Sequence, residues 1–373
     1  MAILNQNVSF ITKFACLLII IIGLGYLFFI GQSIISPLLI ALLFAILLRP
    51  VVAFLARRLH VPNVAACLFS VLLFALLFVG IFYFISTQIA VMAEDWDQIK
   101  HNLNEHYHHI QSYVSDTFNL STKEQNKLMR DATSSPEGAG KQIIGTTLLS
   151  MTDLLMSMII VPVYMFLILL YRNHFKVFAC KLFAEKHHAK LQDIINTIKI
   201  SVQSYILGLM LELLIVSGLT TLGLWVIGVR YAILLGVITG LLNLIPYLGI
   251  FIAGLLSIIA SLTGSSDLSI IIGIIVVNLL VQFIDNNLLV PLVVSSKVEI
   301  NSLATIVGII ISGAIAGIPG MFLAIPLMAI LKVIFDRVEG LQAWGYLLGD
   351  DLPKSFQWKR RGVKAIAEKD VGK

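Results

Sequence analysis

Long apolar runs alternate with short polar segments along the whole chain. The first apolar run extends from Phe14 to Leu48, and only Gly31-Gln32-Ser33 interrupts it. As one helix this run would be about 52 Å long, against about 30 Å of hydrocarbon in a bilayer, so we interpret it as a hairpin of two membrane spans. A third run, at about 64–86, adds another span. The pattern therefore predicts three transmembrane helices within residues 1–88.

A polar segment follows at residues 89–142, where Leu, Ile and Val are spaced among polar residues. This spacing predicts short helices outside the bilayer. Residues 143–171 are apolar enough for a fourth span, and residues 172–201 form a basic segment. Apolar positions of the basic segment follow the i, i+3, i+4, i+7 spacing of an amphipathic helix at the membrane surface: Leu191, Ile194, Ile195 and Ile198.

Two apolar segments of the region 202–337 are interrupted by glycine and proline. Residues 231–262 contain a break that begins at Asn243, and residues 302–335 contain Gly317-Ile318-Pro319-Gly320. Each segment is too long for one upright span and too short for two, and paired breaks of this kind point to the binding region of a transporter. We expect broken helices that re-enter from opposite sides of the membrane. The alternative is a single kinked span for each segment.

With a further span at about 268–284, the fold class is an all-α polytopic membrane protein with about seven or eight transmembrane helices and a small outward helical insertion. Charge predicts its orientation, because cytoplasmic loops carry an excess of Lys and Arg. Residues 89–150 hold five Lys and Arg against eight Asp and Glu, whereas the other loops are basic. We therefore expect residues 89–142 outside the cell. The N-terminus, residues 172–201 and the tail 338–373 are expected in the cytoplasm.

Composition excludes a water-soluble globule. Hydrophobic residues make up 58% of the chain, charged residues make up 13%, and the mean hydropathy is +0.94. So few charges could not cover the surface of a soluble domain. The net charge of +5 is spread over short loops rather than over one face. We therefore expect no nucleic-acid partner, and we expect the basic loops and tail to contact membrane lipid.

Motifs for catalysis and cofactor binding are absent from the sequence. There is no GxxxxGK[S/T] phosphate-binding loop, no HExxH and no GxSxG. Cys16, Cys67 and Cys180 are too scattered for a metal site or a disulfide framework. We expect no enzymatic activity, no cofactor and no metal site.

Three spans carry a polar stripe that contains one acid. The stripes, each on one helix face, are Thr146, Ser150, Asp153 and Ser157; Ser201, Ser204, Gly208 and Glu212; and Asn278, Gln282 and Asp285. An ionised carboxylate in hydrocarbon costs at least about 2.5–3.5 kcal/mol. The three acids are therefore expected to face the protein interior, where they could line one aqueous path.

Each polar candidate also has a plain structural interpretation. Glu212 lies near the middle of its span, where a carboxyl group could bind a proton and exchange it for a cation or a substrate, or could simply pack between helices as a hydrogen-bonded acid. Asp285 and Asn286 could line the path or cap a helix end. Asn243 and Pro246 could form a site from the backbone groups that a broken helix frees, or could mark only a kink.

Four motifs follow one another in order: Ser36-Pro37-Leu38-Leu39-Ile40-Ala41 leading to Arg49-Pro50; Tyr205-Ile206-Leu207-Gly208 followed by Leu241-Leu242-Asn243-Leu244-Ile245-Pro246-Tyr247-Leu248-Gly249; Asp285-Asn286-Asn287-Leu288-Leu289-Val290-Pro291; and Gly317-Ile318-Pro319-Gly320-Met321-Phe322-Leu323-Ala324-Ile325-Pro326. In this order and spacing they resemble the autoinducer-2 exporter family of bacterial permeases, over about residues 10–340. The resemblance implies a bacterial inner-membrane protein of seven or eight spans that self-associates. It also implies signal export or sodium–proton exchange, activities of different members of the family.

The chain departs from the family pattern at two positions. Ile250 stands where a proline often follows the glycine, and Glu212 lies inside the fifth span, which we place at about residues 202–228. The resemblance therefore does not identify the cargo. We place the structural breaks at Pro246, Gly249, Pro291, Pro319, Gly320 and Pro326.

These observations predict a secondary permease that exports a small polar solute or signal molecule and could couple export to cation–proton exchange. The residues expected along the substrate or ion pathway are Glu212, Asp285, Asn243, Gln282, Asn278, Asn286 and Asp153. The expected partners are a small-molecule or ion substrate, membrane lipid and further copies of the chain. The alternative is a non-transporting membrane scaffold that binds partners through residues 89–142 and the basic segment, in which alanine at Glu212 or Asp285 would have no effect.

Overall fold

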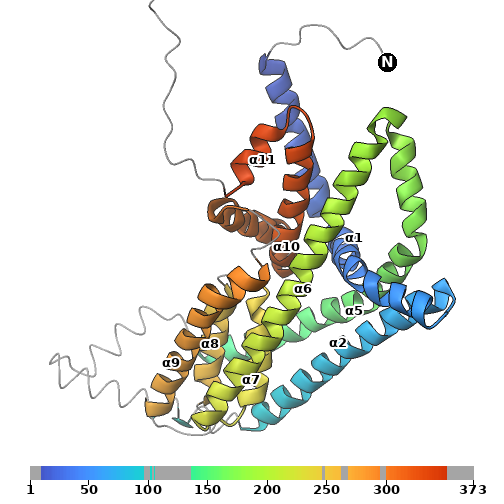
Figure 1. The fold of residues 1–373 in the computed structure, drawn as a ribbon. Helices are drawn as coiled ribbons and strands as arrows, with labels where there is room; N and C mark the ends of the chain where they lie inside the picture. Colours follow the sequence, from blue (N-terminus) through green and yellow to red (C-terminus); the bar gives the residue numbers. More distant parts are fainter. Residues whose placement is uncertain are drawn as a thin grey trace, which may run out of the picture.

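The computed structural model describes residues 10–95, 101–102, 105, 136–245, 248–261, 268–294 and 300–350 (Figure 1). Every regular element in these ranges is helical, which confirms the all-α class. The elements are α1 (Phe10–Arg58), α2 (Asn63–Glu94), α5 (Pro136–Leu182), α6 (His188–Val226), α7 (Ala232–Asn243), α8 (Leu248–Ser261), α9 (Leu268–Ile284), α10 (Ser302–Arg337) and α11 (Gln342–Leu348), with a 3-10 helix at Glu185–His187 and a π-helix, η2, at Asp285–Val294. Most of the predicted insertion at 89–142 lies outside the described ranges.

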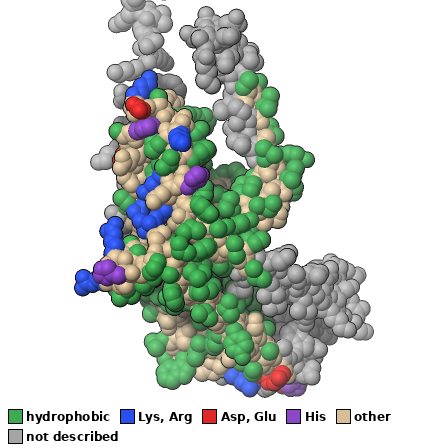
Figure 2. All heavy atoms as spheres, turned by 90° about the vertical axis from the view of Figure 1, so that its right-hand side faces the viewer, with side chains coloured by type: hydrophobic (Ala, Val, Ile, Leu, Met, Phe, Trp, Pro, Cys, Tyr) green, Lys and Arg blue, Asp and Glu red, His purple; other side chains and the backbone are tan. Residues whose placement is uncertain are grey.

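Helices of the described part are long and apolar enough to cross a membrane. Five segments meet this condition: Gly25–Arg58, Asn63–Met92, Glu185–Val226, Ser269–Pro291 and Ser302–Arg337. Two shorter apolar helices, Ala232–Asn243 and Ile252–Ser261, accompany them. Hydrophobic side chains also cover much of the outer surface in Figure 2, as expected of helices that face lipid. The architecture is that of a multi-pass membrane protein.

Helix α1 is continuous where the sequence predicted a hairpin of two spans. Its 49 residues would measure about 73 Å if straight. A single glycine, Gly31, costs a helix only about 1 kcal/mol, and the adjacent Gln32 favours helix. A break inside hydrocarbon would leave backbone groups without hydrogen-bond partners, so continuing the helix is the better solution. Pro37 and Pro50 lie inside α1, which changes direction along its length in Figure 1.

The basic segment 172–201 is a helical hairpin rather than a loop. Helix α5 continues to Leu182, a short 3-10 turn follows, and α6 begins at His188. The amphipathic stretch 191–198 therefore belongs to the same helix as the fifth predicted span. No glycine or proline separates the two parts of α6, which explains why the helix does not stop at the expected boundary.

Helices α7 and α8 form a tight hairpin around the break that begins after Asn243. A Cβ atom on Gly249 of α8 would collide with the carbonyl oxygen of Leu242, so the chain reverses with glycine at the point of closest approach. At the open end of the hairpin, Tyr231 and Ala260 belong to one buried cluster with Leu224 of α6. The base of this hairpin therefore lies at the C-terminal end of α6.

Helix α10 also folds back on itself, at Gly317. This glycine has φ +60°, a left-handed conformation that glycine adopts at low cost. The two arms then pack against each other. A Cβ atom on Gly308 would collide with Met328, and one on Gly320 would collide with the carbonyl oxygen of Ser312. Residues 302–335 therefore form a helical hairpin with its tip at Gly317.

The base of the α10 hairpin lies at the N-terminal end of α6. The backbone N–H of Asn301, just before α10, donates to the carbonyl oxygen of Leu348 in α11 at 2.9 Å. At the other end of α10, Arg337 donates its Nε–H to Oδ2 of Asp193 on α6 at 2.7 Å. The two hairpins thus start from opposite ends of α6 (Figure 1).

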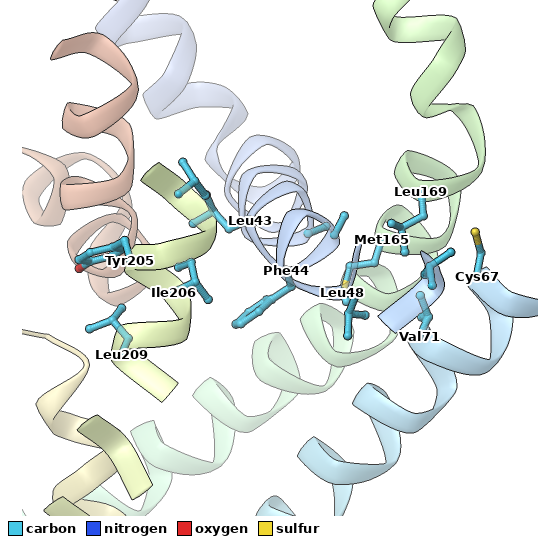
Figure 3. Close-up of a cluster of buried hydrophobic side chains, with 14 of the residues drawn as sticks. Leu43, Phe44, Leu48, Cys67, Val71, Met165, Leu169, Tyr205, Ile206 and Leu209 are labelled. Carbon is cyan, nitrogen blue, oxygen red and sulfur yellow. The ribbon is translucent and has the colours of Figure 1, made fainter. Parts of the chain in front are cut away.

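One buried hydrophobic cluster connects these hairpins with the N-terminal helices. It contains Phe44 of α1, Tyr205 of α6 and Leu323 of α10, and Leu244 from the α7–α8 break packs against it. The ring of Phe44 stacks on that of Phe322 with centroids 6.3 Å apart. Figure 3 shows members of the cluster reaching inward from α1, α2, α5 and α6. Both hairpin tips therefore approach the middle of α6, where Glu212 lies.

Candidate functional site

A buried asparagine at the end of α7 joins two buried acids. Nδ2 of Asn243 donates one hydrogen bond to Oε1 of Glu212 on α6, at 2.7 Å, and another to Oδ2 of Asp285 on η2, at 3.2 Å. Asn243, Glu212 and Asp285 are 8%, 6% and 3% exposed. We refer to these three residues as the acid–amide cluster. It brings together side chains from three elements inside an apolar bundle.

Small residues allow α7 to approach α6 closely enough for this contact. A Cβ atom on Gly240 would collide with the hydroxyl group of Ser217, and one on Gly236 would lie 2.7 Å from the backbone oxygen of the same serine. Asn243 follows Gly240 by one helical turn, so it reaches the buried face of α6 that carries Glu212.

Asp285 is placed where α9 changes helix type. The α-helical backbone ends at Ile284, and the π-helix η2 starts at Asp285 and contains Pro291. Leu289 of η2 packs with Val216 of α6, which holds the π-helix against the helix that bears Glu212. Short π-helical segments are rare and are frequent at functional sites.

Among the described residues, no positive charge balances the acid–amide cluster. Two ionised carboxylates would carry two negative charges, whereas the amide supplies only dipoles. No ion pair of Glu212 or Asp285 occurs within the described ranges, and Oδ1 of Asp285 is buried without a hydrogen-bond partner there. Because uncompensated charges in hydrocarbon are costly, a stable cluster needs bound protons or a bound cation.

Other residues of the predicted pathway that the structure describes have different hydrogen-bond partners. Asn278 donates to the carbonyl oxygen of Ile274 in its own helix, at 3.0 Å. Gln282 donates to Oδ1 of Asn286 at 2.8 Å, so these two satisfy each other. The side chain of Asp153 lies outside the described part of the molecule, although its backbone belongs to α5.

The predicted breaks differ in their surroundings. Pro246 lies outside the described ranges, two residues before the start of α8, whose second residue is the buried Gly249. Pro291 is exposed in η2. Pro319 and Pro326 lie within the second arm of α10, and Gly320 packs at the hairpin close to Ser312.

Two further buried polar residues of α6, the helix that carries Glu212, were not candidates in the sequence analysis. Thr220 lies eight residues after Glu212 on the same buried face of α6, and its hydroxyl group has no partner among the described residues. Tyr205, seven residues before Glu212, is 1% exposed and lies close enough to interact with it electrostatically. Each lies about two helical turns from Glu212, and this spacing was the available signal.

The fold defines a class, the multi-pass membrane proteins. The chain belongs to the AI-2E transporter family, whose model matches residues 16–340. This result confirms the resemblance drawn from the four motifs. Because this family consists of transporters and permeases, the chain is a bacterial membrane transport protein and not an enzyme.

Several bacterial proteins are similar to this chain over most of their length. YueF of Bacillus subtilis is 28% identical over 82% of this chain and 84% of its own. YhhT of Escherichia coli is 25% identical over 94% of this chain and 97% of its own. The permease PerM of Escherichia coli is 29% identical over a shorter part, 36% of this chain and 38% of its own. Their names give membrane transport as an inferred activity.

Proposed function

We propose that the chain is a secondary permease that exports a small polar solute or signal molecule and couples this export to the exchange of protons and cations at the acid–amide cluster. The observation that carries this proposal is the double hydrogen bond from Asn243 to the buried acids Glu212 and Asp285. Two acids that share one neutral donor form a site whose charge depends on what is bound. Such a site suits coupling, because proton and cation can replace each other.

The chemistry of the cluster favours a small hard cation as the exchanged ion. Carboxylate and amide oxygens are the ligands that such ions prefer, and the unpartnered Oδ1 of Asp285 is one of them. With protons on the acids, Asn243 holds a neutral cluster together. When a monovalent cation enters, one proton leaves, so that the cation balances one carboxylate and the remaining proton keeps the other neutral. Sodium and lithium are therefore the first ions to test.

Two hairpins supply a means of alternating access. We propose that α7–α8 and α10 are re-entrant hairpins from opposite sides of the membrane, and that these two hairpins count among the seven or eight membrane segments of the bundle. Their bases at opposite ends of α6 and their tips near its middle support this arrangement. Asn243 lies at the tip of α7–α8, so movement of this hairpin would break its hydrogen bonds to Glu212 and Asp285 and alter ion binding.

The remaining parts of the proposal concern orientation and assembly. The charge distribution supports cytoplasmic termini, a cytoplasmic α5–α6 turn around Glu185–His187, and an extracytoplasmic insertion at residues 89–142. Exposed apolar side chains along the spans are compatible with further copies of the chain as neighbours. We propose that the substrate follows the same path as the ions, past the acid–amide cluster and between the two hairpin tips.

Proteoliposomes containing the full chain test the coupling step. Addition of sodium or lithium to vesicles with an acidic interior is expected to drive proton movement in the wild type. Glu212→Gln and Asp285→Asn should abolish it, because each removes one exchangeable carboxylate while keeping the size of the side chain. Glu185→Gln, an exposed acid in the α5–α6 turn, is the matched control and should keep wild-type flux. Unchanged flux in both cluster variants would refute the proposed site.

A further inference from the structure

Two arginines from distant parts of the sequence meet at one end of the bundle. Arg49 of α1 and Arg172 of α5 are half-buried and close enough for their like charges to interact, and Arg57 of α1 acts on Arg49 in the same way. Within the described part of the chain, no carboxylate is among the charged groups that act on Arg49. Like charges that are partly withdrawn from water repel one another, so this arrangement needs compensation from another source.

The packing beneath these arginines fixes their positions. Leu48, directly before Arg49, lies in one buried cluster with Cys67 of α2 and with Leu169, one turn before Arg172. Figure 3 shows the side chains of Leu48, Cys67 and Leu169 where α1, the start of α2 and α5 converge. The two guanidinium groups are therefore held near each other by a rigid apolar core rather than by flexible surface side chains.

The guanidinium group of Arg172 is only partly satisfied. Its Nη2 donates to Oδ1 of Asn63, the first residue of α2, at 3.2 Å. Its Nη1 is buried and has no hydrogen-bond partner within the described ranges. A buried charged donor without an acceptor costs more free energy than a neutral one. The first backbone N–H groups of α2 also point toward this end, which adds positive potential.

The neighbouring sequence offers no acid to compensate these charges. Residues 1–93, which include all of α1 and nearly all of α2, contain no Asp or Glu, and residues 154–182 of α5 contain none either. Described ion pairs elsewhere engage Lys190, Arg230, Lys332 and Arg337. Figure 2 likewise shows Lys, Arg and His side chains gathered along one side of the molecule with little acidic surface among them.

We propose that Arg49 and Arg172 form a binding site for a phosphate-bearing anion at the end of the bundle where α1 ends and α2 begins. Guanidinium groups present planar pairs of donors that match phosphate oxygens, and Nη1 of Arg172 is the donor awaiting an acceptor. One candidate span ends at Arg58 and the next begins at Asn63. The site between them therefore lies level with the membrane surface. The phosphodiester of an anionic phospholipid is one source of this anion, and inorganic phosphate is the other. The site is separate from the acid–amide cluster and does not depend on the proposed transport.

Thermal unfolding of the purified full chain in a neutral detergent tests this site. Titration with phosphatidylglycerol is expected to stabilise the wild type, and phosphatidylcholine, which has no net charge, is expected to have little effect. Arg49→Gln and Arg172→Gln should weaken the response to phosphatidylglycerol about tenfold or more, as loss of a charge-assisted hydrogen bond implies. Arg58→Gln removes the same charge from an exposed position in α1 and should respond as the wild type does. A phosphate titration separates the sources: an arginine-dependent response to inorganic phosphate assigns a soluble anion, and its absence assigns the lipid headgroup.

Asn63→Asp provides a variant that keeps the fold. A carboxylate at this position would receive the hydrogen bond from Arg172 and supply an internal counter-ion at the start of α2, where an acid is favourable. We expect this variant to be at least as stable as the wild type and to lose most of the response to the anion. Equal stabilisation of all variants by phosphatidylglycerol would show diffuse attraction to basic surface and overturn the proposal. No stabilisation of the wild type by either phosphate source would overturn it as well.

Discussion

Gly240 of α7 lies so close to Ser217 of α6 that a methyl group on the glycine would overlap the serine hydroxyl. This contact sets the spacing between two helices that each carry one member of the acid–amide cluster. A larger residue at position 240 must push α7 away from α6 and stretch the 2.7 Å hydrogen bond between Asn243 and Glu212. Helix packing and ion binding are therefore linked through one small residue.

Gly240→Ala is expected to destabilise the protein by about 1–3 kcal/mol, as overpacking of a close contact does. The same variant should lower cation-driven proton flux, because the cluster is displaced. Gly218→Ala is the matched control, since a Cβ atom on Gly218 of α6 meets no atom within 4 Å. It should be neutral or stabilising by up to about 1 kcal/mol. Thermal unfolding in detergent measures both, and equal behaviour of the two variants would contradict the packing argument.

Removal of the bridging amide should affect both acids at once. Asn243→Ala leaves Glu212 and Asp285 without their shared donor, at a cost of about 1–3 kcal/mol if either acid is ionised. We expect proton exchange to fall at least about tenfold, because one hydrogen bond to a charged group contributes enough free energy for a rate change of that size. In the double variant with Glu212→Gln the two effects should be less than additive, because the same hydrogen bond is lost. Additive losses would show that Asn243 and Glu212 act independently.

A second polar cluster, at the C-terminal end of α6, predicts a graded loss of stability. Oδ2 of Asp95 accepts a hydrogen bond from the hydroxyl of Tyr231 at 2.6 Å and pairs with Nη1 of Arg230 at 2.7 Å. Tyr231→Phe removes one partner and should cost about 0.5–1.5 kcal/mol. Asp95→Ala removes both and should cost more. The exposed neighbour Glu94 is the control, and its replacement by alanine should leave the unfolding temperature unchanged.

Labelling of single cysteines can test the arrangement of the hairpins. In a variant with alanine in place of Cys16, Cys67 and Cys180, Glu339→Cys and Arg230→Cys should react with a membrane-impermeant maleimide from opposite sides. Glu339 is 92% exposed beyond α10, and Arg230 is 53% exposed between α6 and α7. The charge distribution predicts that position 339 reacts from the cytoplasm. Reaction of both positions from one side would disprove hairpins that start from opposite faces.

Sequence reasoning selected the members of the acid–amide cluster but could not bring them together. Glu212 and Asp285 were identified because acids are rare in apolar spans, and Asn243 because it begins a break. Their contact depends on the close approach at Gly240 and on the π-helix that starts at Asp285. Neither the depth of a helix contact nor a change of helix type follows from polar periodicity, so the pairing was not predictable.

The helix boundaries show a different limit. The apolar run through Gly31 was too long for one upright span, and length alone predicted a hairpin there. Excess length also predicted a broken helix at residues 302–335, and α10 does fold back there. What separates the two cases is Gly317, which adopts a left-handed conformation, whereas the backbone at Gly31 remains helical. Hydropathy measures how much chain lies in lipid, and only local backbone preference decides where the chain turns.

Asn301, at the base of the α10 hairpin, has a mechanical consequence. Its Oδ1 accepts from the backbone N–H of Ala304 at 2.8 Å, and its Nδ2 donates to the carbonyl oxygens of Leu347 at 2.7 Å and Gly349 at 3.1 Å. One amide thus caps the start of α10 and the end of α11. The amide clamps α11 to the base of the hairpin, so α10 can tilt without α11 only if these hydrogen bonds break. A small rotation at this clamp becomes a larger displacement at the distant tip.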